Sequence, residues 1–125
     1  MGPFQMGSNH TLPYRDEHLT IDFDRRTAML DAGRMALTRK EYELLALLVR
    51  HAGEIIPRAA LLMEVWGYGP GIRTRTLDVH VRRLRKKLGN YADRYIETIF
   101  GIGYRFQPYY AARVFQPRPM LAIGA

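Results

Sequence analysis

The chain has 125 residues, the size of one domain, and 47% of them are apolar, which is enough to bury a core without covalent staples. Its net charge is +7 and its pI is about 10.1, so the composition favours a polyanionic partner such as nucleic acid, an anionic membrane surface or an acidic protein. The lack of cysteine excludes disulfides and thiolate metal sites and fits a reducing cytoplasm. No apolar run reaches the roughly twenty residues that span a bilayer, and no secretory pattern opens the chain. We therefore expect a soluble cytoplasmic protein without a membrane contact.

The first 37 residues divide into an irregular leader and a set of short strands. Residues 1–10 contain two Gly and a Pro without periodicity, so we expect a disordered leader or the remnant of a linker. After them Leu19, Ile21 and Phe23 alternate with polar residues, which is the period of a half-buried strand. The cluster from Asp31 to Gly33 predicts a hairpin turn. This region is expected to form an antiparallel sheet of three or four strands.

A first helix is predicted from residue 38 onward. Thr38 and Glu41 have the spacing of a capping box, in which a hydroxyl and a carboxylate satisfy free backbone N–H groups at a helix start. Apolar residues then recur at helical spacing as far as Val49, and Gly53 marks the stop.

A second helix follows a short connection. Ile55 and Ile56 are interpreted as a buried link between the helices. Pro57 suits the first turn of the second helix, and Gly67 ends it. Residues 68–72 (YGPGI) form a glycine-bearing loop.

The strongest feature is a basic helix predicted over residues 74–88, with Thr74 as its cap. Residues 73–88 contain seven Lys or Arg and one acid, so they account for +6 of the total charge of +7. One narrow arc of the helix is apolar and predicts contact with a core; it consists of Leu77, Val81, Leu84 and Leu88. The opposite arc consists of Arg75, Thr76, Val79, Arg82, Arg83 and Lys86.

This basic arc can be read as a plain solvated face or as a nucleic-acid contact. A charge run on a helix is usually a solvated face. Here, however, Arg82, Arg83 and Lys86 have no acidic residue four positions before or after them, except that Asp78 can reach Arg82. Most of the repulsion between the basic side chains is therefore uncompensated. Thr76 and Val79 are also short enough for a helix to approach base edges closely. We favour contact with nucleic acid.

The last regular element is predicted to be a hairpin over residues 95–106. Residues 95–100 (YIETIF) alternate as a strand does, and a Gly-Ile-Gly turn leads into a second strand that ends at Phe106. Residues 108–125 have no clear period and are expected to be a loose tail. The predicted domain therefore covers residues 11–107. Its fold class is α+β: a winged helix-turn-helix with an N-terminal antiparallel sheet, three helices and a C-terminal hairpin wing.

Four segments in register carry a resemblance to a known family. They are residues 37–45 (LTRKEYELL), 53–67 (GEIIPRAALLMEVWG), 75–88 (RTLDVHVRRLRKKL) and 96–106 (IETIFGIGYRF). Together they resemble the OmpR/PhoB-type DNA-binding output domain of bacterial two-component response regulators. The resemblance implies a four-stranded N-terminal sheet, double-stranded promoter DNA as ligand, and transcription regulation as activity. It also implies a recognition helix at 74–88 in the major groove and a wing at 95–106 on the flanking backbone or minor groove.

The resemblance also implies roles for single residues. The residues expected to face the major groove are Arg75, Thr76, Val79 and Arg83, with Arg83 reading a base and Val79 meeting a thymine methyl. The residues expected to contact phosphates are His80, Arg82, Arg85 and Lys86, and Arg73 and Arg105 complete the predicted DNA-binding set. These roles agree with chemistry, because an arginine fork matches guanine while charges at the groove margin position a helix without reading sequence.

The sequence departs from the family pattern at two positions. Phe100 stands where the family often has a wing arginine, which leaves Arg105 or the backbone as the expected wing contact. Pro57 replaces a usual Ser or Thr and changes the helix cap.

Further partners follow from the resemblance alone. They are RNA polymerase at loop 68–72, a receiver domain in a longer parent chain, and a second copy on tandem DNA sites. For the loop, a plain tight connection is an equally good reading.

Other functions find less support. An alternative is a winged-helix interaction module that docks an acidic protein partner through the same basic face. RNA binding lacks an aromatic platform. The chain offers no nucleophile with a base, its four histidines lack the spacing of a metal site, and no cofactor is expected, so we predict that it is not an enzyme.

Overall fold

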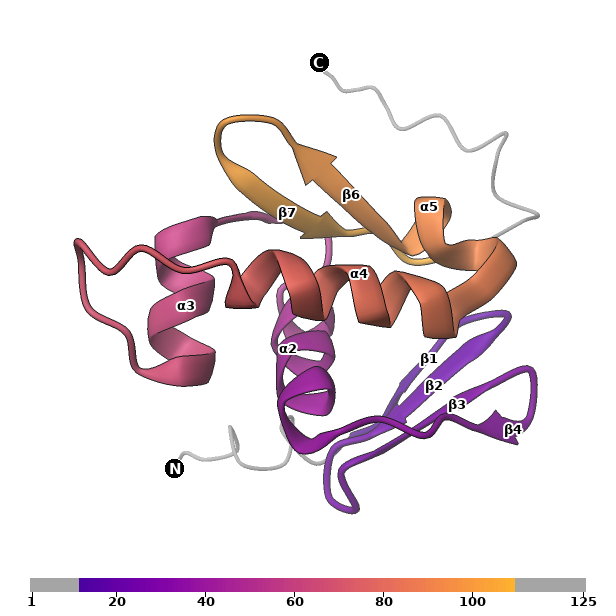
Figure 1. Ribbon diagram of the computed structural model, residues 1–125. Coiled ribbons are helices and arrows are strands. Elements are labelled where there is room, and N and C mark those ends of the chain that lie inside the picture. The colour runs from indigo at the N-terminus through magenta and orange to yellow at the C-terminus, as the bar shows by residue number, and fades with distance from the viewer. Residues whose placement is uncertain (1–11, 110–125) are drawn as a thin grey trace, which may run out of the picture.

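The computed structural model describes residues 12–109, which fold into two antiparallel sheets around three longer helices. The N-terminal sheet lies at one end of the molecule and a smaller sheet with the hairpin at the other, with the helices between them (Figure 1). The predicted leader, 1–10, and most of the predicted tail lie outside the described residues. In the described part of the chain, no helix has the length and apolar character needed to cross a bilayer.

The N-terminal sheet has four strands in sequential order. They are β1 (Tyr14–Arg15), β2 (Leu19–Asp22), β3 (Thr27–Leu30) and β4 (Gly33–Arg34). The predicted alternation is confirmed, because Leu19 and Ile21 are fully buried while the residues between them are half-buried. The β3–β4 turn is also confirmed: Leu30 pairs with Gly33, and Asp31 and Ala32 between them adopt positive φ angles.

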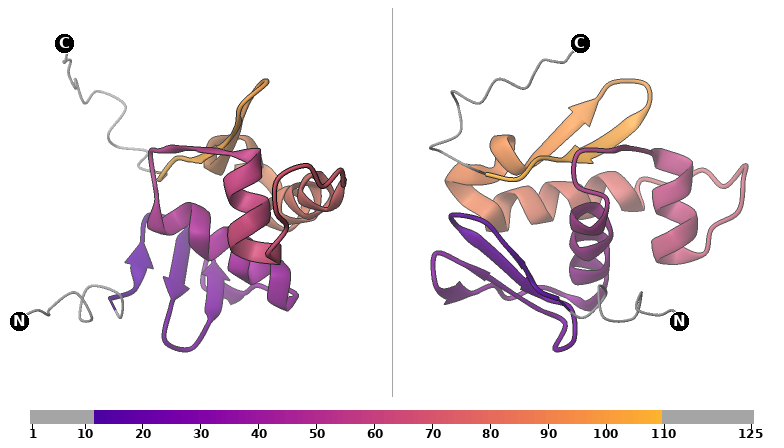
Figure 2. Two further views of the ribbon diagram at one scale, coloured as in Figure 1. Left: turned by 90° about the vertical axis from the view of Figure 1, so that its left-hand side faces the viewer. Right: turned by 180° about the vertical axis from the view of Figure 1, so that it is seen from behind.

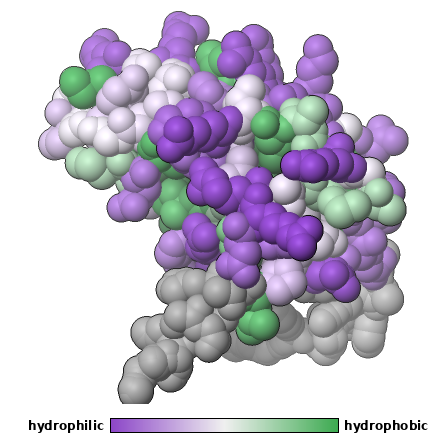
Figure 3. Space-filling view, turned by 90° about the horizontal axis from the view of Figure 1, so that it is seen from below, coloured by the Kyte–Doolittle hydropathy of each residue, from purple (hydrophilic) through white to green (hydrophobic). Residues whose placement is uncertain are grey.

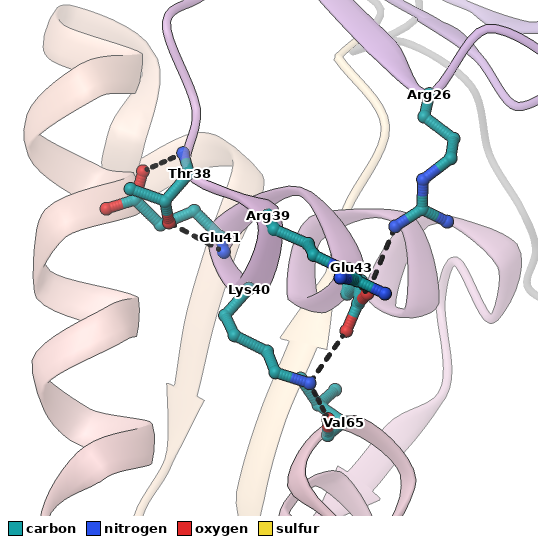
Figure 4. Close-up of polar contacts among 7 residues, drawn as sticks. All are labelled: Arg26, Thr38, Arg39, Lys40, Glu41, Glu43 and Val65. Carbon is teal, nitrogen blue, oxygen red and sulfur yellow. Dashed lines mark hydrogen bonds and ion pairs between the residues drawn. The ribbon is translucent and has the colours of Figure 1, made fainter.

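The first helix, α2 (Arg39–Arg50), begins with the predicted capping box. Thr38 accepts a hydrogen bond from the backbone N–H of Glu41, and the Glu41 carboxylate accepts one from the N–H of Thr38 (Figure 4). The next helix, α3 (Arg58–Trp66), ends at Gly67 in a left-handed conformation. Lys40 joins the two helices, because its Nζ donates to the carbonyl of Val65 at 2.7 Å.

A cluster of charges surrounds the start of α2. Arg26, Arg39 and Lys40 converge on the Glu43 carboxylate at 3.0–3.3 Å (Figure 4). These pairs are largely exposed, so each adds little to stability. The face of the molecule away from the wing carries mostly hydrophilic side chains, with hydrophobic ones scattered among them (Figure 3).

The third helix, α4 (Thr76–Leu88), spans the molecule from the α3 side to the N-terminal sheet (Figure 1). It leads into a 3-10 turn at Gly89–Tyr91 and a short helix, α5 (Ala92–Tyr95), both absent from the prediction. The core is continuous beneath these elements, and its largest fully buried side chains include Tyr95, Phe106 and Leu84.

The wing is a three-stranded sheet instead of an isolated hairpin. It contains β5 (Ile55–Pro57), β7 (Gly103–Phe106) and β6 (Ile96–Ile99), with β7 in the centre. The predicted buried link is wrong for Ile55, whose side chain is 41% exposed, whereas Ile56 is partly buried against the core. Both residues belong to an edge strand, which was not predicted.

Gly103 is essential to this sheet for a reason other than a turn. A Cβ atom at Gly103 would lie 2.0 Å from the carbonyl oxygen of Ile56, which leaves no room for a side chain. The glycine therefore allows β5 and β7 to approach each other closely.

Candidate nucleic-acid interface

The candidate interface is built on α4, whose two faces match the predicted arcs. Its four buried residues are Leu77, Val81, Leu84 and Leu88, the predicted apolar set. In the side view α4 lies at one edge of the molecule, and the wing rises beyond the body next to it (Figure 2). The helix begins at Thr76, two residues later than predicted, and Thr74 accepts a hydrogen bond from the Thr76 N–H at 3.1 Å.

Five basic side chains on the outer face of α4 and in the loop before it form no hydrogen bond or ion pair with the described residues. Arg73, Arg75, Arg82, Arg83 and Lys86 are all exposed. None of them makes a hydrogen bond or ion pair with another residue in the range 12–109. Five exposed cations therefore lie along α4 and the loop before it without an ion pair in the described part of the chain, and only Arg75 is close enough to Asp78 for the charge of that carboxylate to be felt. Thr76 and Val79, whose side chains are shorter, are half-buried among them.

Asp78 lies within helical reach of Arg82 but does not pair with it. Its carboxylate instead accepts hydrogen bonds from the Arg58 guanidinium, at 2.5 and 3.2 Å, and from the Tyr104 hydroxyl at 2.9 Å. Because it accepts charge-assisted hydrogen bonds from Arg58, and another from Tyr104, the pKa of Asp78 lies below its usual value although burial opposes the shift. Asp78 thus joins α3, α4 and β7, and Arg75 is the one outer cation that contributes to its pKa shift.

Arg85 is directed toward the wing. Its Nη2 donates to the carbonyl of Ile96 at 2.8 Å and to the hydroxyl of Thr98 at 2.7 Å, and the guanidinium also lies over the Tyr104 ring. Its Nε atom is buried. This geometry argues against the expected phosphate contact and favours a role in holding β6 against α4.

Arg105 is also engaged within the protein. Its Nε and Nη2 atoms lie 2.9 and 2.8 Å from the Glu97 carboxylate on the neighbouring strand β6. The predicted wing cation is therefore neutralised by a cross-strand partner, which sequence analysis did not identify.

His80 lies on the flank of α4 that faces α3. Its Nδ1 is 2.8 Å from the carbonyl oxygen of Thr76, and its ring meets Trp66 edge to face at 4.9 Å. Trp66 is half-buried, so it packs between α3 and α4.

The C-terminal end of α4 is fixed to the start of α2. Lys87 donates to the Glu41 carboxylate at 2.5 Å and to the carbonyl of Ala36 at 2.7 Å. Glu41 is 1% exposed. Burial would raise its pKa, but hydrogen bonds from Lys87 and Thr38 outweigh that effect and lower it. Lys87 is consequently a structural cation, unlike the outer ones.

The interface therefore separates the basic residues of α4 into two groups. One group is free, and the other, Arg85 and Lys87, positions the helix. Sequence analysis missed Arg58, which holds Asp78 in place. Two signals were available: Arg58 lies within the family motif, and Asp78 is the single acid in residues 73–88. Residues 12–109 contain no group of His, Cys, Asp or Glu that could hold a metal ion.

A basic helix packed across a helical pair and flanked by a β-hairpin defines a winged helix, a variant of the helix-turn-helix. Comparison with known proteins agrees with this class. The family model described as "Transcriptional regulatory protein, C terminal" matches residues 32–106. The chain therefore belongs to the C-terminal domains of transcriptional regulatory proteins of the OmpR/PhoB type.

Several relatives are similar over most of the described chain. The transcriptional regulatory protein ResD of Bacillus subtilis (strain 168) is 42% identical over 93 residues, which are 72% of this chain and 39% of ResD. The Klebsiella pneumoniae RstA DNA-binding domain, solved in complex with RstA box, is 36% identical with a TM-score of 0.72, covering 78% of this chain and 98% of that one. The response regulator DrrB, a Thermotoga maritima OmpR/PhoB homologue, is 34% identical with a TM-score of 0.69, covering 76% of this chain and 44% of that one. The chain thus spans about two fifths of the length of the curated relative, ResD.

Proposed function

We propose that this domain binds double-stranded promoter DNA sequence-specifically and serves as the output domain of a two-component response regulator. In this proposal α4 occupies the major groove, and the β6–β7 hairpin lies on the flanking backbone or minor groove. The function is regulation of transcription, without catalysis or a cofactor.

One observation carries the proposal: five exposed cations on the outer side of α4 and the loop before it form no side-chain hydrogen bond or ion pair among the described residues. Like charges on one surface repel each other and destabilise an isolated domain, so folding stability does not explain why they are concentrated here. A binding partner does. A polyanion that lies along the helix is such a partner, because phosphates neutralise the cations and release counterions.

The free residues suggest a division of roles along α4. Arg83 is exposed on the outer face and can offer a bidentate fork to a guanine, with Val79 next to a thymine methyl. Arg75 and Thr76 at the start of the helix complete the base-facing set. Arg73, His80, Arg82 and Lys86 contact phosphates. Arg85 and Arg105 act indirectly, by holding the wing in place.

The family membership suggests partners beyond DNA. We propose that the parent protein contains a receiver domain, since this chain matches two fifths of the length of ResD. We also propose that two copies bind tandem sites, that loop 68–72 contacts RNA polymerase, and that the protein acts in the cytoplasm.

Selection of bound duplexes from a random pool tests the proposal. We expect recovery of a defined sequence, and a direct repeat if two copies bind. Neutralisation of three to five phosphates should give a slope of about −3 to −4.5 in a plot of log affinity against log salt concentration.

The same experiment separates DNA binding from the alternative function. If the chain bound no duplex at physiological salt, the basic face would be assigned to an acidic protein partner instead. Recovery of unrelated sequences with a steep salt dependence would leave DNA binding intact but contradict sequence-specific recognition.

A further inference from the structure

The tip of the wing presents an unusual side chain to solvent. Phe100 is 90% exposed, more than any other large hydrophobic residue in the described part of the chain. Ile102, two residues later, is 49% exposed. An aromatic ring that makes so little contact with its own protein contributes nothing to the core and exposes apolar surface to water.

The backbone that carries Phe100 is fixed in place. The turn is closed by a hydrogen bond from the Ile102 N–H to the carbonyl of Ile99 at 2.9 Å, and Gly101 adopts a φ of 79°. The carbonyl of Ile102 in turn accepts a hydrogen bond from the N–H of Arg58 at 3.0 Å, at the start of α3. Phe100 therefore projects from a rigid turn that is tied to the helix-turn-helix, and binding it would cost little backbone entropy.

The wing tip carries no charge. Residues 99–103 (IFGIG) contain no Lys or Arg, and the cation nearest to them along the hairpin, Arg105, is paired with Glu97. The side chains at the tip therefore do not attract DNA electrostatically. They can make only apolar contacts, beside any hydrogen bond from the backbone.

The tip is also continuous with the proposed DNA surface. Arg85 joins β6 to α4, and Tyr104 joins β7 to Asp78 on α4, so the hairpin and the helix form one unit. The tip rises beyond the body of the molecule at the end opposite the N-terminal sheet (Figures 1 and 2). With a helix in the major groove, a hairpin held alongside it reaches the strand backbone and the adjacent minor groove.

We propose that Phe100 enters this minor groove as an uncharged wedge that partly unstacks one base step, an inference that rests on the proposed function. Apolar side chains inserted from the minor-groove side kink DNA at flexible steps. The wedge would select deformable pyrimidine–purine steps at a fixed distance from the bases that α4 reads. The wing would thus add specificity through shape, without a hydrogen bond to a base.

The test uses the full chain and the best duplex recovered from the random pool. 2-Aminopurine, which fluoresces more when unstacked, is placed in turn at each position flanking the core sequence. We expect a rise in fluorescence at one or two adjacent flanking positions on binding. Phe100→Ala should abolish that rise and weaken affinity about 5- to 150-fold, the range of one lost base–aromatic stack.

Two matched variants sharpen the test. Phe100→Ala removes no charge, so the slope of affinity against salt should stay unchanged, whereas Phe100→Arg should make it steeper by about 0.9 if the arginine reaches a phosphate. Met29→Ala serves as a control, because Met29 is 40% exposed on β3 of the other sheet. It should change neither affinity nor fluorescence. Phe100→Leu keeps an apolar wedge and should retain part of the effect. It replaces Phe100→Ala in the test if that variant folds poorly.

The outcomes are distinguishable. Binding by the unaltered chain with no unstacked position and with full affinity in Phe100→Ala would overturn the wedge while leaving the proposed function intact. A loss confined to cooperative binding of two copies would assign Phe100 to a contact between copies and would also overturn it. Failure of the unaltered chain to bind any duplex would overturn the proposed function and this inference together.

Discussion

Replacement of Glu41 tests how α4 is held in position. Glu41 is almost fully buried and has two tasks: its carboxylate accepts the Thr38 N–H at 2.9 Å as part of the capping box, and it pairs with Lys87 at 2.5 Å. Glu41→Gln keeps an oxygen acceptor for the cap but removes the charge that faces Lys87. Glu41→Ala removes both functions. Comparison of the two variants therefore separates the cap from the ion pair.

The structure sets the expected size of each effect. Breaking a buried pair can cost 3–5 kcal/mol, but Lys87 is 35% exposed and keeps its bond to the Ala36 carbonyl, so the stranded cation remains partly hydrated. We expect Glu41→Gln to reduce the free energy of unfolding by about 1–2 kcal/mol. Loss of the cap adds about 1 kcal/mol in Glu41→Ala, and the cavity adds more.

Urea denaturation at several pH values measures these changes. The pKa of Glu41 is lowered below its ordinary value of 4.5 in the folded protein, so its charge stabilises the fold fully above that value. The contribution is lost as the pH falls through the lower, folded-state pKa. The difference between the unaltered chain and Glu41→Gln should therefore be constant near neutrality and shrink in acid below about pH 4.5.

A matched exposed carboxylate provides the control. Glu54 has a 70% exposed side chain near His51, so Glu54→Gln should change stability by less than about 0.5 kcal/mol. The reasoning would be refuted if Glu41→Gln were as mild as Glu54→Gln. It would also be refuted if the deficit of Glu41→Gln stayed the same from neutral pH down to pH 3.

Further substitutions test the wing and the outer face. Arg83→Ala should reduce discrimination between selected and random duplexes by about 1–3 kcal/mol, whereas Arg82→Ala should weaken both alike, as titrations of the two duplexes would show. Arg85→Ala should lower the free energy of unfolding by about 1–2 kcal/mol and weaken DNA binding without reducing its salt slope, because its charge faces the wing; a reduced slope would restore it as a phosphate contact. Gly103→Ala should destabilise by more than about 2 kcal/mol in chemical denaturation, since its Cβ would collide with Ile56, and unchanged stability would contradict the described strand packing.

Local features of the fold were predictable because short-range periodicity carries them. The buried seam of α4 follows from an apolar residue at every third or fourth position, and the structure buries the four expected side chains. The Thr38–Glu41 cap and the Asp31–Ala32 turn were predictable for the same reason, since each depends on residues close together in sequence.

The remaining contacts were not predictable because they join distant segments. Three residues, Ile55–Pro57, are too few to show a period, and their strand exists only because β7 lies beside them some fifty residues later. Periodicity places Arg82 four residues after Asp78, so sequence reasoning could point only to a partner on the same helix. The true partners come from α3 and β7. The fold therefore determines which arginines are paired within the protein. Composition alone does not distinguish them.

The pairing of β5 with β7 determines where the chain can change length. One residue added within Ile55–Pro57 would exchange the two faces of that strand and turn α3 by about 100° about its axis relative to the wing. Residues added between Phe100 and Gly101 would only extend the hairpin past its last paired position. A library that varies this tip in sequence and length would therefore leave the scaffold intact and diversify what the domain touches beside the major groove.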